Sequence, residues 1–327
     1  MLPVIDSTVS PEALSHWLHK NYDFNEVPTV RLFRTGINHT YMVEGDSHQS
    51  VLRLYSHGWR SRIQVEEEIK VVRLAQEAGM SVSCPLADST GNFIHELEAP
   101  EGTRLAMLFS FAEGKKVRHF SCGLCEQLGE AMGRFHRASE GNTVERITYN
   151  ADSLVTQPYG YARKFFSQDN ADMQFIRRAG EKVASMFAEA DQGSIRKGIV
   201  HLDIWYDNMS ITPGEKFTIF DFDFCGNGWL LHDIAYFLMQ LRRQEPDRDV
   251  YEQKREAFLR GYRSVSTISE TEMALLPWSG LSIWIFYLGV QCRRFDNWSN
   301  VFLSENYLTM FMGMAKDWLA YNGEKLP

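Results

Sequence analysis

The sequence predicts an α+β protein of two lobes, with an antiparallel β-sheet in the first lobe and mainly helices in the second. Three observations indicate this organisation. Between residues 29 and 55, short runs of alternating apolar and polar residues are separated by polar turns, as in antiparallel strands with one buried face. After residue 120 the apolar residues recur at helical spacing instead. The chain of 327 residues is also too long for one ordinary core and suits about two lobes.

Composition and charge exclude several classes of protein. Hydrophobic residues make up 44% of the chain, which excludes general disorder. The formal net charge of -8 argues against binding of a nucleic-acid backbone, which normally needs a basic face. The chain shows no basic segment followed by an apolar run near its start, and its most apolar stretch, residues 281–290, is too short to cross a bilayer. We therefore expect a cytoplasmic protein without a membrane or nucleic-acid partner.

The cysteines fit the same expectation. There are five, an odd number, and they are scattered along the chain, which suits free thiols in a reducing compartment. Cys122 and Cys125 form a C-x-x-C pattern, but no second pair exists and the two lie in a helical pattern. Zinc binding and redox chemistry are therefore not favoured there.

The first 55 residues predict one helix and three strands. Ser10 is the expected cap of a helix over residues 11–20, with proline in its first turn. The turn after the first strand carries a single glycine, so a phosphate loop with three glycines is absent. Any phosphate cover at this turn would use Thr35, Asn38 and the backbone. The expected strands span residues 29–33, 41–44 and 50–55.

One basic residue interrupts the third strand. Arg53 lies inside the apolar run Val51-Leu52-Arg53-Leu54, and a half-buried arginine needs a partner or an anion. The next expected helix, residues 63–78, offers three consecutive glutamates at positions 66 to 68. A strand arginine followed by a helix glutamate is the order of the ion pair that positions nucleotide phosphates in kinases. Alternatively, Arg53 points to solvent and the glutamates form an exposed helix edge.

The boundary between the lobes is expected about one third of the way along the chain. Residues 105–111 read as a buried strand, and a glycine-containing crossover breaks the strand at 112–114. We place the first lobe at residues 1–111, a hinge at about 109–114 and the second lobe at 115–327. Backbone groups between Phe109 and Ala112, those of Phe111 included, are expected to hydrogen-bond the edge of an adenine.

The second lobe is expected to be helical on both sides of a central polar stretch. His136, beside the apolar face of the first of these helices, reads as a structural histidine with satisfied partners rather than a ligand. Asp233 lies near a helix start, where it either interacts with the helix dipole or accepts hydrogen bonds from the central stretch and holds its shape. The main expected helices begin at about residues 121, 175, 229, 251, 271 and 304.

The central stretch carries the candidate chemistry. Two short apolar segments, 198–200 and 217–220, each end in polar residues, and Thr212-Pro213-Gly214-Glu215 between them reads as a turn. Two strands joined by this turn would bring Asp203, Asn208 and Asp221 to one end of one ribbon. One carboxylate would then orient or deprotonate an acceptor hydroxyl, and the amide oxygen and second carboxylate would hold Mg²⁺ against the phosphates of a nucleotide. The alternative is a coincidental turn or a relic without activity.

On these residues the chain resembles the aminoglycoside phosphotransferase-like kinases, which have a protein-kinase-like fold, near the homoserine-kinase and stress-response-kinase branches. The resemblance covers almost the whole chain. Its most specific parts are His201-x-Asp203-x-x-x-x-Asn208 and Ile219-Phe220-Asp221-Phe222-Asp223. Weaker matches lie at Leu52-Arg53, 68–79, 111–114, 133–136, 232–235 and 258–262.

The resemblance implies a role for each polar residue of the central stretch. Asp203 would be the catalytic base of a phosphoryl transfer from ATP to a hydroxyl. Asn208 and Asp221 would bind Mg²⁺, and Asp223 would assist as a second metal or loop contact.

The resemblance also implies roles in the first lobe, and three positions depart from it. Arg53 would occupy the position of the nucleotide lysine, with Glu68 as its partner, and a guanidinium can still clamp phosphate through two bonds. Leu202 stands where glycine is common, and Trp205 and Tyr206 replace smaller or polar residues. None of these changes removes a group that phosphoryl transfer requires.

The sequence thus predicts an ATP- and Mg²⁺-dependent kinase of an unidentified hydroxylated small molecule, a monomer or homodimer. One alternative is a protein Ser/Thr kinase of the stress-response type, but only nine residues separate Asp223 from Asp233, which leaves little room for a peptide platform. A nucleotide-binding pseudokinase or scaffold is another. Several residues near the end of the chain either line the acceptor pocket or belong to the core: Trp278, Trp284, Tyr287, Arg293, Arg294, Asp296 and Trp298.

Overall fold

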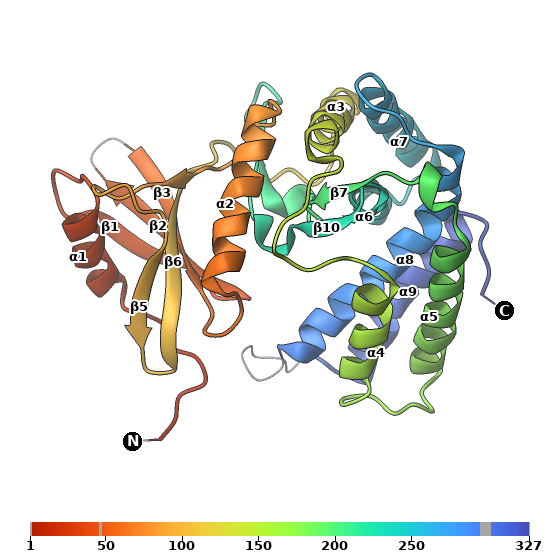
Figure 1. Ribbon diagram of the computed structural model, residues 1–327, viewed down its shortest axis with the longest axis horizontal. Coiled ribbons are helices and arrows are strands. Elements are labelled where there is room, and N and C mark those ends of the chain that lie inside the picture. The colour runs from red at the N-terminus through yellow and green to blue at the C-terminus, as the bar shows by residue number, and fades with distance from the viewer. Residues whose placement is uncertain (1, 46–47, 295–301, 327) are drawn as a thin grey trace.

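The computed structural model describes residues 2–45, 48–294 and 302–326, and it has a β-rich first lobe and a mainly helical second lobe (Figure 1). The polar turns of the first lobe fold its strands into an antiparallel sheet in the order β1-β2-β3-β6-β4, with β5 also paired to β6. The strands are β1 (Thr29–Arg34), β2 (Asn38–Gly45), β3 (His48–Tyr55), β4 (Pro85–Leu86), β5 (His95–Ala99) and β6 (Gly102–Ser110).

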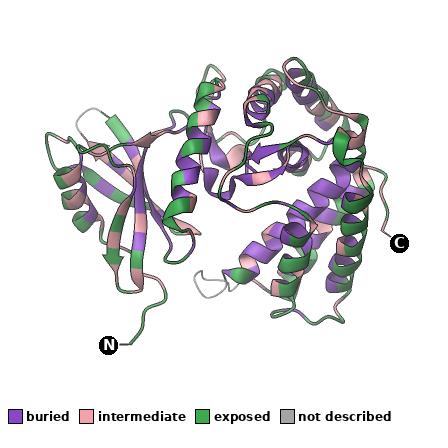
Figure 2. Cartoon of the chain, viewed as in Figure 1, coloured by how far each residue is buried: buried purple, intermediate pink, exposed green. Residues whose placement is uncertain are grey.

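Each face of this sheet is covered by one helix because the strands alternate their side chains. Helix α1 (Pro11–Asn21), capped by Ser10 as expected, packs its Leu14 and Leu18 with Leu52 of β3 on one face. Helix α2 (Arg62–Glu77) packs on the other face, where Val65 meets residues of β3 and β6. Both sets are fully or almost fully buried, as the purple colouring of the inner faces in Figure 2 shows.

Helix α2 belongs to both lobes. Its first half contributes to the sheet cluster, whereas Val71, Val72 and Ala75 on its second half belong to the large core of the second lobe. In Figure 1 this helix stands between the sheet and the other helices. The chain leaving it is also hydrogen-bonded to the second lobe, because the Ser83 N–H donates to the Ile219 carbonyl at 2.9 Å. The lobes are therefore joined by packing and backbone bonds as well as by the crossover.

The second lobe is built from seven α-helices among the described residues and two short two-stranded sheets. The helices are α3 (Cys122–Ser139), α4 (Gln157–Ala162), α5 (Ala171–Glu189), α6 (Leu231–Gln244), α7 (Arg248–Arg263), α8 (Glu270–Arg293) and α9 (Glu305–Tyr321). Helix α8 is long and apolar enough to cross a membrane by length and composition, but 83% of its most apolar window is buried inside the protein. Burial of this kind is typical of a core helix.

The central stretch forms two two-stranded sheets, whereas the sequence predicted one. β7 (Lys197–Val200) pairs with β10 (Gly226–Trp229), and β8 (Met209–Ile211) pairs with β9 (Phe217–Ile219). The predicted turn at 212–215 therefore joins β8 to β9, not β7 to β9. The segment 226–229 is a strand because its backbone bonds to β7, and α6 starts two residues later than predicted. The loops that follow β7 and β9 still lie together, as the contacts of the candidate site show.

Helices α3 and α7 approach so closely that only glycine fits between them. A β-carbon on Gly129 of α3 would lie 2.0 Å from the carbonyl oxygen of Phe258, and one on Gly261 of α7 would lie 1.9 Å from that of Glu126. We expect Gly129→Ala to lower the free energy of unfolding by about 1–3 kcal/mol, because the helices must separate.

Urea unfolding followed by circular dichroism measures this effect. Gly313→Ala in α9 is the matched control, since nothing lies within 4 Å of the added carbon and the helix should gain about 0.5–1 kcal/mol. Equal stability of Gly129→Ala and the wild type would contradict the close approach.

Candidate active site

The loop between β7 and β8 is held in shape by Asp233 of α6. The N–H of His201 donates to Oδ2 of Asp233 at 2.9 Å, and the N–H of Leu202 donates to Oδ1 at 2.6 Å. Leu202 has a positive φ of 63°, a strained conformation for a branched residue that these bonds help to fix. Of the two roles weighed for Asp233, the structure therefore shows the second, support of the loop backbone.

His136 is a structural residue, as the sequence predicted. Its two ring nitrogens lie 2.7 Å from the Tyr262 hydroxyl and 3.0 Å from Asp233 Oδ2, and the ring is fully buried. Burial alone would raise the pKa of Asp233, but the bond and charge of His136 and the loop N–H groups lower it. Asp233 is thereby kept as an acceptor of hydrogen bonds.

Asp203 lies in this loop with both carboxylate oxygens in hydrogen bonds. The Tyr236 hydroxyl of α6 donates to Oδ1 at 2.5 Å, and the Asn208 amide donates to Oδ2 at 2.6 Å. Tyr287 of α8 anchors the loop from the other side through a 3.1 Å bond to the Leu202 carbonyl. Burial, followed by the charge of Asp221, raises the pKa of Asp203 to about 8, despite the hydrogen bonds that lower it. A carboxyl with this pKa can exchange a proton near neutral pH.

Asp221 faces the same space from the loop after β9. Its backbone is left-handed, with φ of 68°, and its side chain is 38% exposed. Its Oδ1 lies 3.1 Å from Arg53 of β3, so a carboxylate of the second lobe meets a cation of the first. Because the Asn208 amide nitrogen is bound to Asp203, its oxygen is the group that remains to act as a ligand. The structure thus brings the predicted Asp203, Asn208 and Asp221 together.

Arg53 is the centre of a buried ion-pair network. It lies 3.0 Å from Oε1 of Glu68, and the Tyr55 hydroxyl donates to Oε2 of Glu68 at 3.0 Å. Glu68 is fully buried, and its burial raises its pKa although Arg53 and Arg146 lower it. Burial would lower the pKa of Arg53, but the charges of Asp221 and Glu68 raise it, so the guanidinium stays charged. Of the two alternatives for Arg53, the structure has the buried pair.

Asp223 occupies a different place from the metal position predicted for it. Its Oδ2 accepts a 2.7 Å hydrogen bond from the Trp59 indole, and its Oδ1 lies 2.9 Å from Nε of Arg60. Burial would raise its pKa, but Arg60 and Arg146 lower it to about 2. Both oxygens are therefore committed to the segment that enters α2, and Asp223 joins the lobes. Of the two roles given to Asp223, a metal contact or a loop contact, these bonds favour the loop contact.

The segment after β6 (Gly102–Ser110), predicted as the hinge, leads toward β8 of the second lobe. Phe109 is buried in β6 with its ring centre 5.0 Å from the Arg53 guanidinium, and Phe111 follows the end of that strand. Gly114 has φ of 111° and approaches the Ile211 carbonyl so closely that a β-carbon would lie 2.4 Å from it. The N–H of Lys115 donates to the same carbonyl at 3.0 Å, which attaches the crossover to β8.

Sequence reasoning missed several residues of the site. Tyr236, Trp59 and Arg60 come from apolar or turn segments that carried no motif, and only the fold brings them to the aspartates. Asp207 was also missed: it lies 2.6 Å from Lys116 and 3.3 Å from Arg34, a pair that links the first-lobe turn to the loop.

The residues suggested for the acceptor pocket separate into three groups. Trp278 is buried in the core, whereas Tyr287 reaches the Asp203 loop and Trp284 lines a pocket that α6, α8 and α9 form. Arg293 and Arg294 lie with their guanidinium carbons 5.4 and 4.9 Å from the Trp59 ring centre, beside the lobe contact. Asp296 and Trp298 lie outside the described residues.

No group of three or more His, Cys, Asp or Glu side chains in the described ranges is arranged to hold a metal ion by itself. The candidate set is one carboxylate and one amide oxygen, Asp221 and Asn208. Mg²⁺ in phosphoryl-transfer sites is commonly bound by one or two protein oxygens together with the phosphates, so this donor set fits the ion.

Comparison with known proteins gives the same picture as the geometry. The model of a phosphotransferase enzyme family matches residues 29–268. A homoserine kinase of Agrobacterium fabrum is 25% identical over 260 residues, which cover 78% of this chain and 77% of that protein.

Two solved structures have a similar fold. An amicoumacin kinase in complex with AMP-PNP, Ca²⁺ and its ligand superposes with a TM-score of 0.77 at 19% identity, over 97% of this chain and 95% of that one. A microcompartment-associated aminopropanol kinase superposes with a TM-score of 0.76 at 20% identity, over 96% and 99% of the two chains. The two-lobe fold predicted from the sequence is thereby confirmed.

Proposed function

The chain belongs to the phosphotransferase enzyme family, and on that premise we propose that it transfers the γ-phosphate of ATP to a hydroxyl of a small molecule, with Mg²⁺ as cofactor and Asp203 as the base. The observation that carries this proposal is the convergence of three polar groups from separate loops. Asn208 donates to Asp203 at 2.6 Å, and Asp221 faces Arg53 at 3.1 Å across the space between the lobes.

Asp203 accepts the proton of the acceptor hydroxyl in this proposal. Tyr236 and Asn208 hold its carboxylate in one orientation, and burial raises its pKa to about 8. A base whose pKa lies near the working pH combines a useful ionised fraction with sufficient basicity. The hydroxyl would therefore be oriented toward the γ-phosphate and lose its proton as the new bond forms.

Asp221 and the oxygen of Asn208 would hold Mg²⁺. The ion would supply positive charge against the negative charge that develops on the transferred phosphate. The exposed part of the Asp221 side chain faces solvent and remains accessible to a ligand. Arg53, positioned by Glu68, would clamp the phosphates, because a guanidinium matches phosphate oxygens through two bonds.

The nucleotide base would lie against the hinge. We propose that the backbone from Phe109 to Ala112, including Phe111, bonds the adenine edge, between a first lobe of residues 1–111 and a second lobe of 115–327. The crossover is fixed to β8 by Lys115, so this backbone is held at a constant distance from the loop that carries Asp203.

A small acceptor fits better than a protein. The segment from Asp223 to Asp233 holds a short 3-10 turn, the four residues of β10 and the start of α6, which leaves no extended platform for a peptide. The relatives described above are named as kinases of homoserine, aminopropanol and amicoumacin, all small molecules. We therefore do not favour the protein-kinase alternative, and phosphate transfer to casein-like proteins would be the result that reverses this preference.

Replacement of Asp221 tests the magnesium site. We expect Asp221→Asn to lower ATP turnover by at least about a hundredfold and to abolish the rise of turnover with Mg²⁺ concentration, because one charged metal ligand is lost. ADP release is measured over a panel of hydroxylated metabolites and aminoglycosides, with Mg²⁺ varied at each acceptor.

The control is Asp249→Asn, which removes an exposed carboxylate near the start of α7. Its Mg²⁺ dependence should equal that of the wild type. Unchanged Mg²⁺ dependence in Asp221→Asn would remove this residue from the metal site. A scaffold that only binds nucleotide would show no acceptor-dependent ADP release in either protein.

A further inference from the structure

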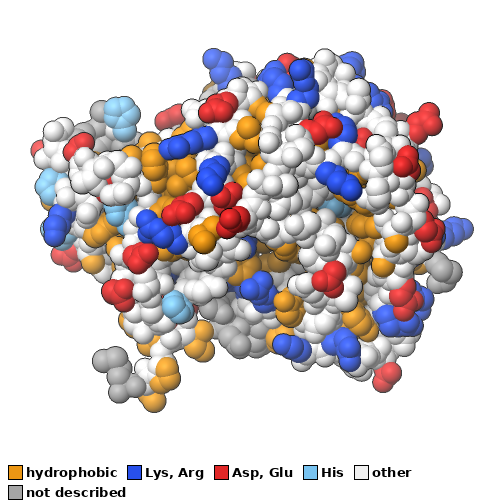
Figure 3. Space-filling model, viewed as in Figure 1, with side chains coloured by type: hydrophobic (Ala, Val, Ile, Leu, Met, Phe, Trp, Pro, Cys, Tyr) orange, Lys and Arg blue, Asp and Glu red, His pale blue; other side chains and the backbone are white. Residues whose placement is uncertain are grey.

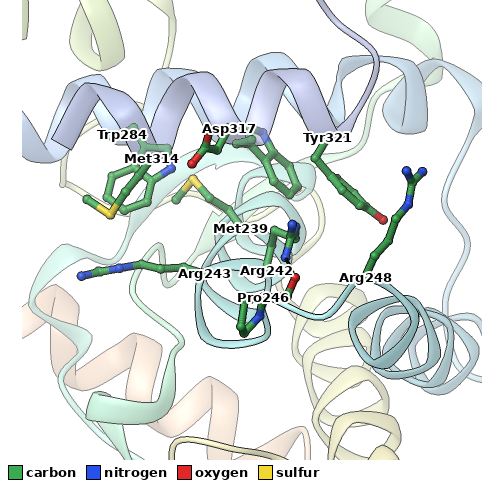
Figure 4. Close-up of a pocket in the computed structure, with 10 residues that line it drawn as sticks. Met239, Arg242, Arg243, Pro246, Arg248, Trp284, Met314, Asp317 and Tyr321 are labelled. Carbon is green, nitrogen blue, oxygen red and sulfur yellow. Dashed lines mark hydrogen bonds between the residues drawn. The ribbon is translucent and has the colours of Figure 1, made fainter. Parts of the chain in front are cut away.

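A pocket of about 610 Å³ opens in the helical lobe between α6, α8 and α9 (Figure 4). Its volume is within the range of small-molecule sites. Met239, Trp284, Met314, Trp318 and Tyr321 give it apolar and aromatic walls. Such walls suit a ligand with an apolar or flat body rather than a heavily hydroxylated one.

The charges around this pocket are mostly positive. Arg242, Arg243 and Arg248 line it against a single carboxylate, Asp317. Within the described part of the chain, none of the three arginines forms an ion pair with a carboxylate, although the protein as a whole is acidic. Three guanidinium groups beside low-dielectric walls create a local positive potential that attracts an anion and repels a cation.

Two side chains of the pocket, Trp284 and Arg243, donate no hydrogen bond to the described part of the protein. The Trp284 indole N–H is buried without a hydrogen-bond partner in the described structure, and the Trp284 side chain lines the pocket. Arg243 lies with its guanidinium carbon 6.0 Å from the centre of the Trp284 ring. Arg242, by contrast, donates to the Glu245 and Pro246 carbonyls through Nη1. An indole and a guanidinium can only donate, so their common ligand must accept.

Helices α6 and α8 carry residues of the pocket and also residues that contact the loop of the proposed base. Tyr236, which donates to Asp203, is followed on the same face of α6 by Met239 and Arg243, one and two helical turns further on. On α8, Trp284 is one turn from Tyr287, and the rings of Tyr236 and Tyr287 are 5.5 Å apart. The helical rise places Arg243 about 10 Å from Tyr236 along the axis.

We propose that this pocket selects the acceptor and that the acceptor is a hydroxylated carboxylate with an apolar or aromatic body. Its hydroxyl would lie at Asp203, and its carboxylate would accept hydrogen bonds from Arg243 and the Trp284 indole, roughly 5–10 Å away. Polycationic aminoglycosides would be excluded by the same arginines. The statement that the bound molecule is the phosphate acceptor rests on the proposed phosphoryl transfer. The statement that the pocket binds a carboxylate does not.

Three probes of equal shape and different charge test the proposal. They are 4-(hydroxymethyl)benzoate, its neutral amide and 4-(aminomethyl)benzyl alcohol. In each probe one benzene ring separates the hydroxymethyl group from the carboxylate, amide or aminomethyl group. Binding is measured by calorimetry in the presence of AMP-PNP and Mg²⁺, so no transfer is required. The carboxylate should bind the wild type at least about tenfold more tightly than the amide or the amine, and more weakly as salt is raised.

Reversing the charge of one arginine of the pocket tests the role of that residue. Arg243→Glu should weaken carboxylate binding by at least about tenfold and leave the affinity for AMP-PNP unchanged. Arg178→Glu, the same change at an exposed position on α5, should leave both affinities unchanged.

Tighter binding of the amine or amide, equal binding of the carboxylate by Arg243→Glu and the wild type, or no carboxylate binding at millimolar concentration would each overturn the proposal. Because transfer is not measured, these outcomes are independent of the Asp221→Asn test. In an active enzyme Arg243→Glu should raise KM for a carboxylate acceptor.

Discussion

Replacement of Asp203 by Asn is expected to lower kcat by at least about a thousandfold, within the range that a positioned general base contributes. The amide keeps the size of the side chain and can still accept from Tyr236, which donates to the native carboxylate at 2.5 Å. It cannot take up the acceptor proton. ADP release at saturating ATP and acceptor measures the loss, and the affinity for AMP-PNP should change little. Turnover by Asp203→Asn at the wild-type rate would show that Asp203 is not the base.

The pH dependence of kcat/KM in the wild type gives a second test of Asp203 as the base. The pKa of Asp203 in the free protein is raised to about 8 by burial and by the charge of Asp221, and the base must be ionised to act. We therefore expect kcat/KM to rise with pH through about 8. A cation bound at Asp221 would offset the negative charge of this residue and lower the pKa of Asp203. The pH midpoint of kcat should therefore lie below that of kcat/KM. Profiles without any rise between pH 6 and 9 would contradict this assignment.

The stability of the folded protein should fall as pH rises, whereas kcat/KM should rise. The folded-state pKa of Asp203 lies above its unfolded value of 3.8, so its contribution to stability is present below pH 4 and is lost as pH rises toward about 8. Asp203→Asn removes this ionisation. The variant should therefore gain Tm relative to the wild type between pH 5 and 9, and the gain should increase with pH. A variant that is inactive but more stable would indicate that the buried carboxylate of Asp203 destabilises the protein and is needed for its activity.

Removal of Arg53 is expected to have the largest effect on stability. Arg53→Ala should lower the free energy of unfolding by about 3 kcal/mol, because it leaves the fully buried Glu68 without its nearest cation. It should also raise KM for ATP by at least about tenfold, since the phosphate clamp is lost. Chemical unfolding and ADP release measure the two effects. Arg53→Lys should lose less stability and less affinity for ATP than Arg53→Ala, because lysine keeps the positive charge but lacks the forked geometry of the guanidinium.

A double variant separates the buried charge from the loss of contacts. Arg53→Ala with Glu68→Gln has no uncompensated carboxylate, and it should recover most of the lost stability at pH 8 without recovering the KM for ATP. The single variant should also be less destabilised at pH 5, where protonation of Glu68 relieves the charge, since loss of Arg53 raises the pKa of Glu68 further. Equal stability of the single and double variants at pH 8 would show that Glu68 is not ionised in the absence of Arg53.

The sequence predicted those parts of the fold that depend on local patterns. The cap at Ser10, the crossover glycine at 114 and the apolar spacing of the later helices follow from backbone preferences and periodicity, and the structure has each of them. The pairing of strands was predicted less well. β7 pairs with β10 and not with β9, because strand pairing depends on chain packing that a run of four residues does not encode.

The same division applies to the candidate site. Asp203, Asn208 and Asp221 were found because their spacing reflects one chemistry, and Arg53 because a charge inside an apolar strand requires a partner. For Asp223 the sequence left a metal contact and a loop contact open, because its partners Trp59 and Arg60 come from the segment before α2, more than 160 positions away. Tyr236 and the arginines of the α6 pocket have no local signal at all, since their roles arise from helix packing.

The contact between Arg53 and Asp221 has a consequence for the order in which ligands assemble. In the free protein the guanidinium already serves as the counter-ion of the carboxylate that Mg²⁺ would occupy. On the proposed function, an incoming cation would have to exchange with a tethered one, so we expect the bare ion to bind weakly. The triphosphate would offer the guanidinium another partner and release the carboxylate, so nucleotide and metal would bind together.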